Sequence, residues 1–420
     1  MLKDLKIYLF IISVCGVTLI PAMSALDKAA TQWLYLSTVM LVFTVTTNFE
    51  IKKYLQTYFT KAYSWFVILA LVSLSYTNNL SVSLVDLSRH LSIFILGVIA
   101  FSLIKEKSIN LYKISIIVSA FLLYECIISL RPLISYIYSV GLDFSTITSV
   151  DIDHFKGVTG NRNITTAAMV CKIPFALYLI YQNNKRIIAI FGAVCIFSSS
   201  LVMFIITSRA ALLSLSLYIL MLVAYAIIRM NTEKHKKTII SSVLFLMILA
   251  LSFTFSRIIL PTSSSDAAAR LSSIELSNQS SSNRFILWEN AYDYISKNPL
   301  IGCGIGNWKI ESSAYWSNIG ASYLVPFHAH NDFLEFTTEL GIIGGLAYLM
   351  IFIFLFLALF KLIIKNKSEE SFYLCLALTG LFVDSFFNFP FERPIMQVLF
   401  VIIISFGAKL FNQNQLRDEI

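Results

Sequence analysis

Charged residues are scarce in this chain. Asp, Glu, Lys and Arg make up 13% of its 420 residues, whereas about 25% is usual for a soluble domain. Hydrophobic residues make up 57%, and the mean hydropathy is +0.76. Apolar runs recur along the chain at about 20 residues, the length that crosses a bilayer. The composition therefore excludes an ordinary soluble protein and predicts an all-α polytopic membrane protein.

Cysteine is also scarce, and its six positions are scattered. Five lie in apolar runs, where a thiol behaves as a small hydrophobe. Only Cys303 lies in a hydrophilic segment, so neither a disulfide framework nor a paired-cysteine metal site is expected. The first apolar run lacks a convincing signal-peptide cleavage site, and we interpret it as a retained helix.

The apolar runs predict about twelve membrane spans. Basic residues alternate between the two sides of these spans, so the positive-inside rule accounts for much of the net charge of +8, and we do not expect nucleic-acid binding. The predicted spans are 6–24, 31–48, 62–77, 90–104, 112–130, 164–182, 187–206, 210–228, 239–256, 341–362, 371–388 and 395–410.

These spans divide the chain into three parts. Residues 1–256 hold nine spans, 257–340 form one large external loop with short helices, and 341–420 hold the last three spans. A Ser-, Ala- and Asn-rich stretch from Pro261 to Asn283 is typical of a mobile loop. The turn Gly302–Gly306 follows a predicted helix, and it lacks the strand–helix frame of a nucleotide-binding motif.

The two sides of the predicted membrane differ in the kind of basic residue. The cytoplasmic side has 16 lysines and 3 arginines, whereas the external side has 5 lysines and 8 arginines. The planar guanidinium suits bidentate phosphate contacts. This bias favours an anionic, phosphorylated ligand on the external side, although ordinary ion pairing would also explain any single arginine.

Three external arginines are candidate ligands for such an anion. Arg209 lies in a tight turn between two apolar helices, where a charge is costly unless it snorkels to the interface. Arg284 begins a predicted helix, whose free N–H groups could meet the same anion, or it is a solvated surface charge. Arg162 follows Asn161 before the sixth span; alternatively, this stretch is only a helix entry capped by Asn163.

Two histidines precede the tenth span. His328 and His330 are two residues apart, which cannot place both on one helical face, so a metal site is a weak interpretation. Proton transfer by one imidazole is the stronger hypothesis; the alternative is a simple interfacial hydrogen bond.

Further polar residues lie in or beside the spans. Glu125 and Lys172 either pair with each other or line a ligand cavity. Asp384, Asn388 and Arg393 form a cluster at the last external turn, where structural pairing and function are equally good explanations.

At these positions the chain resembles the O-antigen ligase family, within the group that includes O-antigen polymerases and O-oligosaccharyltransferases. The family signature is His, then Asn, Ser or Gln, nine residues, Gly, two residues, and then Gly, Thr or Tyr; His330, Asn331, Gly341 and Gly344 fit it. Three further stretches resemble shared elements of the group: Ser208-Arg209-Ala210, the stretch from Asn283 to Gly306, and Gly160-Asn161-Arg162-Asn163. In the last of these, Arg162 replaces the usual proline.

The resemblance implies a GT-C-like membrane glycosyltransferase with its active site facing the periplasm from the bacterial inner membrane. The donor would be a glycan on undecaprenyl diphosphate, and the acceptor a sugar hydroxyl of the lipid A–core. The reaction would invert the anomeric centre without a metal or another cofactor. His330 would be the base, with Arg209, Arg284 and Arg162 on the diphosphate, and Asn331, Asn161, His328, Gly341 and Gly344 in support.

Three other functions stay open at this stage. A polymerase would use the growing glycan as acceptor, and an O-oligosaccharyltransferase would use a protein serine. The single dominant external loop favours the ligase over the polymerase. A flippase for lipid-linked oligosaccharides belongs to another class, and it would leave the histidine signature unexplained.

Overall fold

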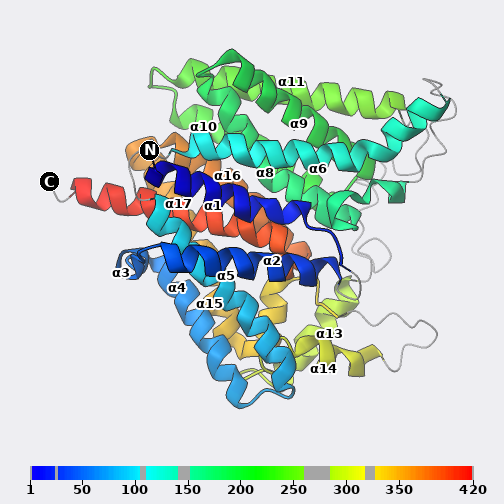
Figure 1. Ribbon diagram of the computed structural model, residues 1–420, viewed down its shortest axis with the longest axis vertical. Coiled ribbons are helices and arrows are strands. Elements are labelled where there is room, and N and C mark those ends of the chain that lie inside the picture. The colour runs from blue at the N-terminus through cyan, green and yellow to red at the C-terminus, as the bar shows by residue number, and fades with distance from the viewer. Residues whose placement is uncertain are drawn as a thin grey trace. The chain divides into compact units, whose positions relative to one another are not determined.

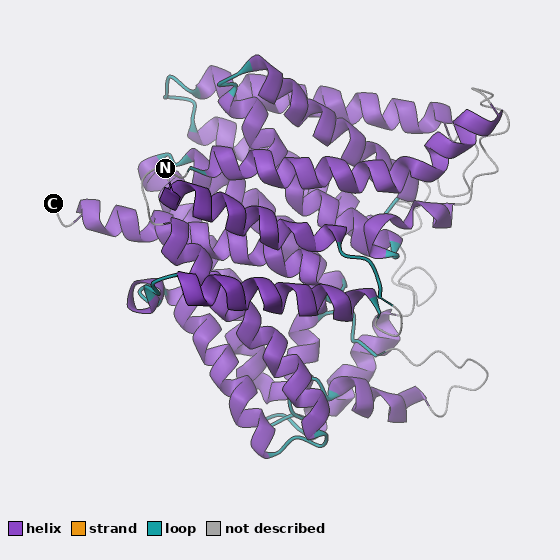
Figure 2. Cartoon of the chain, viewed as in Figure 1, coloured by secondary structure: helices purple, strands orange, loops and turns teal. Residues whose placement is uncertain are grey.

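A computed structural model describes residues 2–23, 27–104, 110–140, 152–259, 284–316 and 327–418. Across these residues the chain is helical and no β-strand is present, as Figure 2 shows. Within these described ranges, eleven helices are long and apolar enough to cross a membrane. The predicted all-α polytopic architecture is therefore confirmed, whereas the loop predicted for Pro261 to Asn283 lies outside the described residues.

The sequence predicted about twelve spans, one more than the number of described helices that are long enough to cross a membrane. The first apolar segment gives α1 (Leu2–Cys15) and a 3-10 turn, η1 (Gly16–Leu19), and its apolar part, Leu5–Leu19, is shorter than a span. Ile20 is extended, with ψ 119°, directly before Pro21. Proline disfavours a helical conformation in the residue before it, which explains why the helix does not continue.

The chain forms two compact units. The first comprises 1–32, 106–273 and 359–383, and the second comprises 33–105, 274–358 and 384–420. The described helices are α2 (Lys28–Thr46), α3 (Ile51–Tyr54), α4 (Tyr58–Val72), η2 (Ser73–Ser75), α5 (Leu80–Ile104), α6 (Leu111–Val140), η3 (Ile152–Thr159), α8 (Arg162–Gln182), α9 (Arg186–Ile206), α10 (Arg209–Ile228), α11 (His235–Ile259), α13 (Arg284–Lys297), α14 (Trp308–Trp316), α15 (Asp332–Asn366), α16 (Glu369–Phe387), η4 (Pro390–Glu392) and α17 (Pro394–Asp418).

Helix α8 is the core of the first unit. It packs against both α6 and α9 (Figure 1). The whole of its most hydrophobic 18-residue stretch is buried. A helix that is apolar all round is expected at such a central position. In the second unit, α17 packs along α5, and the short helices α13 and α14 lie beside each other (Figure 1).

Helix α15 is interrupted at Gly341, which has φ 69° and ψ −179°. The interruption frees carbonyl groups that would otherwise accept bonds within the helix. The glycine-rich turn fills the gap: Cys303 N donates to Thr338 O (3.0 Å), and Gly304 N donates to Glu339 O (2.8 Å). Ile342 N donates in turn to Pro299 O (2.9 Å).

The glycines of this turn allow close approach on two sides. An added Cβ at Gly302 would lie 2.4 Å from Thr338 O, and one at Gly306 would lie 2.0 Å from Asp86 Oδ2. Asn307 continues the contact with the start of α5, since its Nδ2 donates to Ser83 Oγ at 2.7 Å. The segment after α13 is thus held between α5 and the break in α15.

Replacement of Gly341 by alanine should destabilise the protein. The new Cβ would lie 2.2 Å from Leu300 O in a left-handed backbone conformation. We expect the free energy of unfolding to fall by about 2–5 kcal/mol, the sum of strain and overpacking, measured as a lower melting temperature in detergent.

Gly160→Ala is the matched control, because Gly160 also has positive φ (71°) but an added Cβ there meets no atom within 4 Å. Its cost should be the backbone term alone, about 1–2 kcal/mol. Equal shifts for the two variants would contradict the role of the helix break.

Candidate functional site

His330 stands immediately before α15 in a left-handed conformation, with φ 52°. The next residue, Asn331, caps the helix: its Oδ1 accepts from Leu334 N (3.1 Å), and its backbone O accepts from Glu335 N (2.9 Å). Asp332 then accepts from Tyr348 Oη (3.1 Å) and Phe391 N (3.3 Å). The Asn of the signature therefore fixes the point at which the helix begins, and hence the position of His330.

The ring of Phe389 brings three functional groups together. His328 stacks on it at 4.2 Å, with an interplanar angle of 15°. His330 meets it edge to face at 4.9 Å and 82°. The Arg393 guanidinium lies over the same ring, 4.5 Å from its centroid. Such stacking and cation–π contacts orient all three groups around one rigid residue.

The imidazole of His330 is neutral at neutral pH. Burial lowers its pKa to about 4, and the positive charges of Arg284, His328 and Arg393 act in the same direction. Its Nδ1 is buried and has no hydrogen-bond partner among the described residues. A deprotonated ring nitrogen in a cationic environment is suited to accept a proton once an anion offsets the surrounding charge.

Arg284, the first residue of α13, is fixed by a polar chain from the end of α16. Its Nη2 donates to Asn388 Oδ1 (3.2 Å), and Asn388 Nδ2 donates to Asp384 Oδ1 (2.6 Å). One turn along α13, Trp288 packs against Phe386, with ring centroids 5.7 Å apart. The polar cluster predicted at the last external turn, Asp384, Asn388 and Arg393, thus belongs to the surroundings of His330. Arg284 lies in the same unit.

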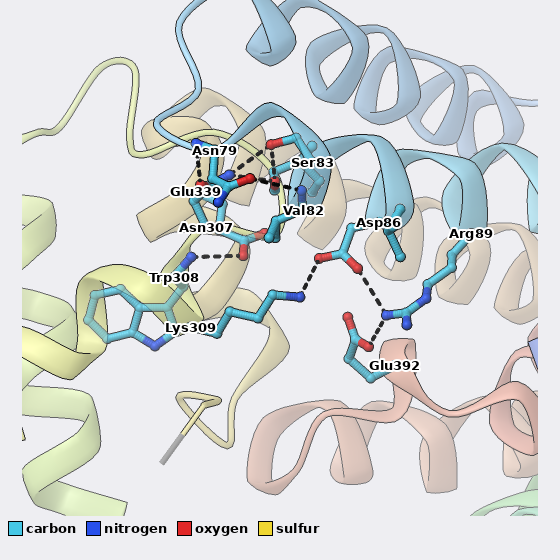
Figure 3. Close-up of polar contacts among 12 residues, drawn as sticks. Asn79, Val82, Ser83, Asp86, Arg89, Asn307, Trp308, Lys309, Glu339 and Glu392 are labelled. Carbon is cyan, nitrogen blue, oxygen red and sulfur yellow. Dashed lines mark hydrogen bonds and ion pairs between the residues drawn. The ribbon is translucent and has the colours of Figure 1, made fainter. Parts of the chain in front are cut away.

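A network of charged side chains links η4 to α5 and to Lys309 (Figure 3). Arg89 Nη1 lies 2.9 Å from Asp86 Oδ1 and 2.5 Å from Glu392 Oε2, and Lys309 Nζ lies 3.4 Å from Asp86 Oδ2. Burial would raise the pKa of Glu392, but Arg89, and to a smaller extent His328, bring it below its usual value. The network holds η4, and with it the neighbouring Phe389 and Arg393.

Sequence reasoning missed Asp86, Arg89, Glu335 and Glu392 as parts of this site. The predicted fourth span began at residue 90, whereas α5 begins at Leu80, so Asp86 and Arg89 are charges within a membrane-length helix. Charges in such helices are functional candidates by default, and a longer predicted span would have singled them out.

Three further predicted residues, Arg209, Arg162 and Asn161, belong to the first unit, whereas the signature glycines Gly341 and Gly344 belong to the second. Arg209 is the first residue of α10, after Thr207 in a left-handed conformation (φ 54°). Arg162 is the first residue of α8, and it is half-buried. The cap of α8 is Asn161, whose Oδ1 accepts from Asn163 N (2.9 Å), so the alternative cap considered above, Asn163, was wrong. Convergence of Arg209 and Arg162 with His330 stays a prediction.

Glu125 and Lys172 pair with each other, which was one of the two hypotheses drawn from the sequence. Lys172 Nζ lies 2.5 Å from Glu125 Oε1, and each side chain is 4% exposed. Both belong to membrane-length helices of the first unit, α6 and α8. A fully buried pair without solvent contact indicates a structural role in holding these two helices together.

Lys172→Met should therefore be strongly destabilising, because it leaves the Glu125 carboxylate buried and unpaired. We expect a loss of about 3–5 kcal/mol, measured as reduced membrane yield and melting temperature in detergent. The double variant Lys172→Met/Glu125→Leu is the control, and it should recover most of the loss. A double variant no more stable than the single one would contradict this account.

Comparison with known proteins gives one finding on family. Residues 191–349 match the family model described as O-antigen ligase (Wzy_C). The matched stretch contains Arg209, Arg284 and His330, together with both glycines of the signature. The resemblance expected from the sequence is thereby confirmed. No curated protein matches the chain.

Proposed function

Since residues 191–349 carry the O-antigen ligase family domain, and the chain is a multi-span membrane protein of the ligase/polymerase type, we propose that it is an O-antigen ligase. In this proposal it transfers glycan from undecaprenyl diphosphate to a sugar hydroxyl of the lipid A–core, at the periplasmic face of the inner membrane. The observation that supports it most is a neutral imidazole, His330, beside the fixed cation Arg284.

The reaction follows from this pairing. His330 accepts the proton of the acceptor hydroxyl as its oxygen attacks the anomeric carbon. The bond from that carbon to the diphosphate oxygen breaks, and the bonding pair leaves with the diphosphate, which inverts the centre. Diphosphate needs no proton to leave, so a base and charge stabilisation suffice, and the proposal includes no metal.

Arg284 would stabilise the diphosphate as charge develops on it, and we assign Arg209 and Arg162 to the same anion. A bound diphosphate would offset the positive charge that lowers the pKa of His330. The base would therefore become more basic when the donor is present, which favours proton transfer only in the productive complex.

His330→Ala should abolish ligation, with a loss of about 10²–10⁴-fold, because general-base catalysis is removed. The variant is tested in a strain lacking the gene, by lipopolysaccharide gel and by the amount of polymer left on undecaprenyl diphosphate. His235→Ala is the control, since His235 lies in the first unit, where its Nδ1 is 3.1 Å from Ala226 O.

The same gel separates the neighbouring functions. Core without polymer indicates a ligase, core bearing a single repeat indicates a polymerase, and an unchanged gel with unglycosylated pilin indicates a protein-directed enzyme. Ligation at the wild-type level by His330→Ala would remove this residue from the mechanism.

Arg209→Lys should lose most activity although it keeps the charge. An ammonium cannot reproduce the two-pronged contact of a guanidinium with phosphate oxygens, and we expect a decrease of about 10-fold or more. The rate is measured with purified enzyme and lipid-linked donor, with Arg257→Lys as the matched control. A rate equal to wild type would show that charge alone is sufficient.

A further inference from the structure

We propose that the two histidines of this site divide the work: His328 serves as a cationic ligand of the donor diphosphate, while His330 remains the neutral base. The proposal rests on the proposed function and extends it to a residue outside the His330–Gly344 signature. It assigns His328 a hydrogen bond from Nε2–H to a phosphate oxygen of the donor.

The first support is the carboxylate that holds His328. Glu335, in the first turn of α15, accepts from His328 Nδ1 at 2.7 Å and from Ala329 N at 2.9 Å. Both carboxylate oxygens are thus used, and Glu335 is 8% exposed. This arrangement orients the ring and assigns a proton to Nδ1.

The second support is Nε2 of His328, the ring nitrogen that does not bond to Glu335. Stacking on Phe389 fixes the plane of the imidazole, and the bond to Glu335 fixes its rotation. No hydrogen bond to Nε2 is found within the described ranges, and 22% of the His328 side chain remains exposed. A protonated ring held in this way presents one charged N–H donor to an incoming anion.

The third support is the charge around His328. Glu335 on α15 and Glu392 on η4 face it as anions, and Arg393 faces it as a cation. Burial alone would lower the pKa of His328, but the charge and hydrogen bond of Glu335, and then Glu392, raise it above its usual value. A raised pKa extends the pH range over which the ring is charged, and the charge is lost as the pH rises through that pKa.

His330 lacks these features. No carboxylate holds its ring among the residues that the structure describes, and burial, assisted by the charges of Arg284, His328 and Arg393, lowers its pKa to about 4. The surroundings of the two imidazoles therefore move their pKa values in opposite directions, upward for His328 and downward for His330. Sites that use two like groups as acid and base are commonly built in this way, by environments that separate their pKa values.

The competing role for His328 is that of the base itself, since an imidazole held by a carboxylate is also the arrangement of a base with its orienting partner. The two roles make opposite predictions for pH dependence. A cationic ligand must be protonated, so its titration limits activity at high pH. A base must be deprotonated, so its titration limits activity at low pH.

The experiment is a pH–rate profile of glycan transfer by purified enzyme with lipid-linked donor, for wild type, Glu335→Gln and His328→Arg. Glu335→Gln keeps the acceptor for Ala329 N but removes the charge, so the alkaline limb should move to lower pH. His328→Arg carries a permanent charge, so it should retain activity and lose the alkaline limb. His328→Gln should be about 10–100-fold slower, the loss of one charged hydrogen bond.

Glu289→Gln is the matched control, because Glu289 is exposed on α13, and its profile should equal that of wild type. The position of a limb does not depend on how much enzyme is folded, so partial misfolding cannot imitate the result. Movement of the acid limb in Glu335→Gln, an inactive His328→Arg, or unmoved limbs would each overturn the proposal. Wild-type enzyme that transfers nothing from this donor would instead overturn the proposed function.

Discussion

The interruption of α15 at Gly341 is the constraint on which the second unit depends. It releases the carbonyls of Thr338 and Glu339, and the glycine turn Gly302–Gly306 binds to them. The helical piece between Asn331 and Gly341 is therefore a fixed spacer, capped at one end and locked at the other. This explains physically why the signature places a glycine at a set distance from its histidine: the glycine anchors the piece whose first residues position the imidazole.

The second theme is the balance of charge around one aromatic ring. Phe389 contacts the imidazoles of His328 and His330 and the guanidinium of Arg393. The carboxylates of Glu335 on α15 and Glu392 on η4 act on His328. Glu392 is shared between Arg89 and this site, so the α5 network moderates the negative charge that His328 experiences. In the proposed function, this arrangement would attract an anion while leaving the His330 imidazole unprotonated.

Sequence reasoning succeeded where a residue had a clear role in its own segment. The apolar runs gave the helices, and the signature included Gly341, the glycine at which α15 is interrupted. The cost of two charges in neighbouring apolar segments led to two hypotheses for Glu125 and Lys172, of which pairing is the one that the structure shows. In each case local chemistry limited the alternatives.

It failed where partners come from distant segments. Glu335 looked like an ordinary acid in a first helical turn, and nothing in its own segment pointed to His328 as its partner. Arg89 and Glu392 are separated by 303 positions, so only the packing of η4 on α5 reveals their contact. The first helix was predicted too long because the effect of Pro21 on Ile20 was not considered.

The Glu125–Lys172 pair also limits how strongly the Lys172 charge couples helix α8 to a voltage across a membrane. A lone lysine carried across the bilayer would exchange about 2.3 kcal/mol with the field for each 100 mV. Because its charge is cancelled by a carboxylate 2.5 Å away, the pair exchanges almost none. The pair therefore adds almost no voltage-dependent energy to the position of helix α8.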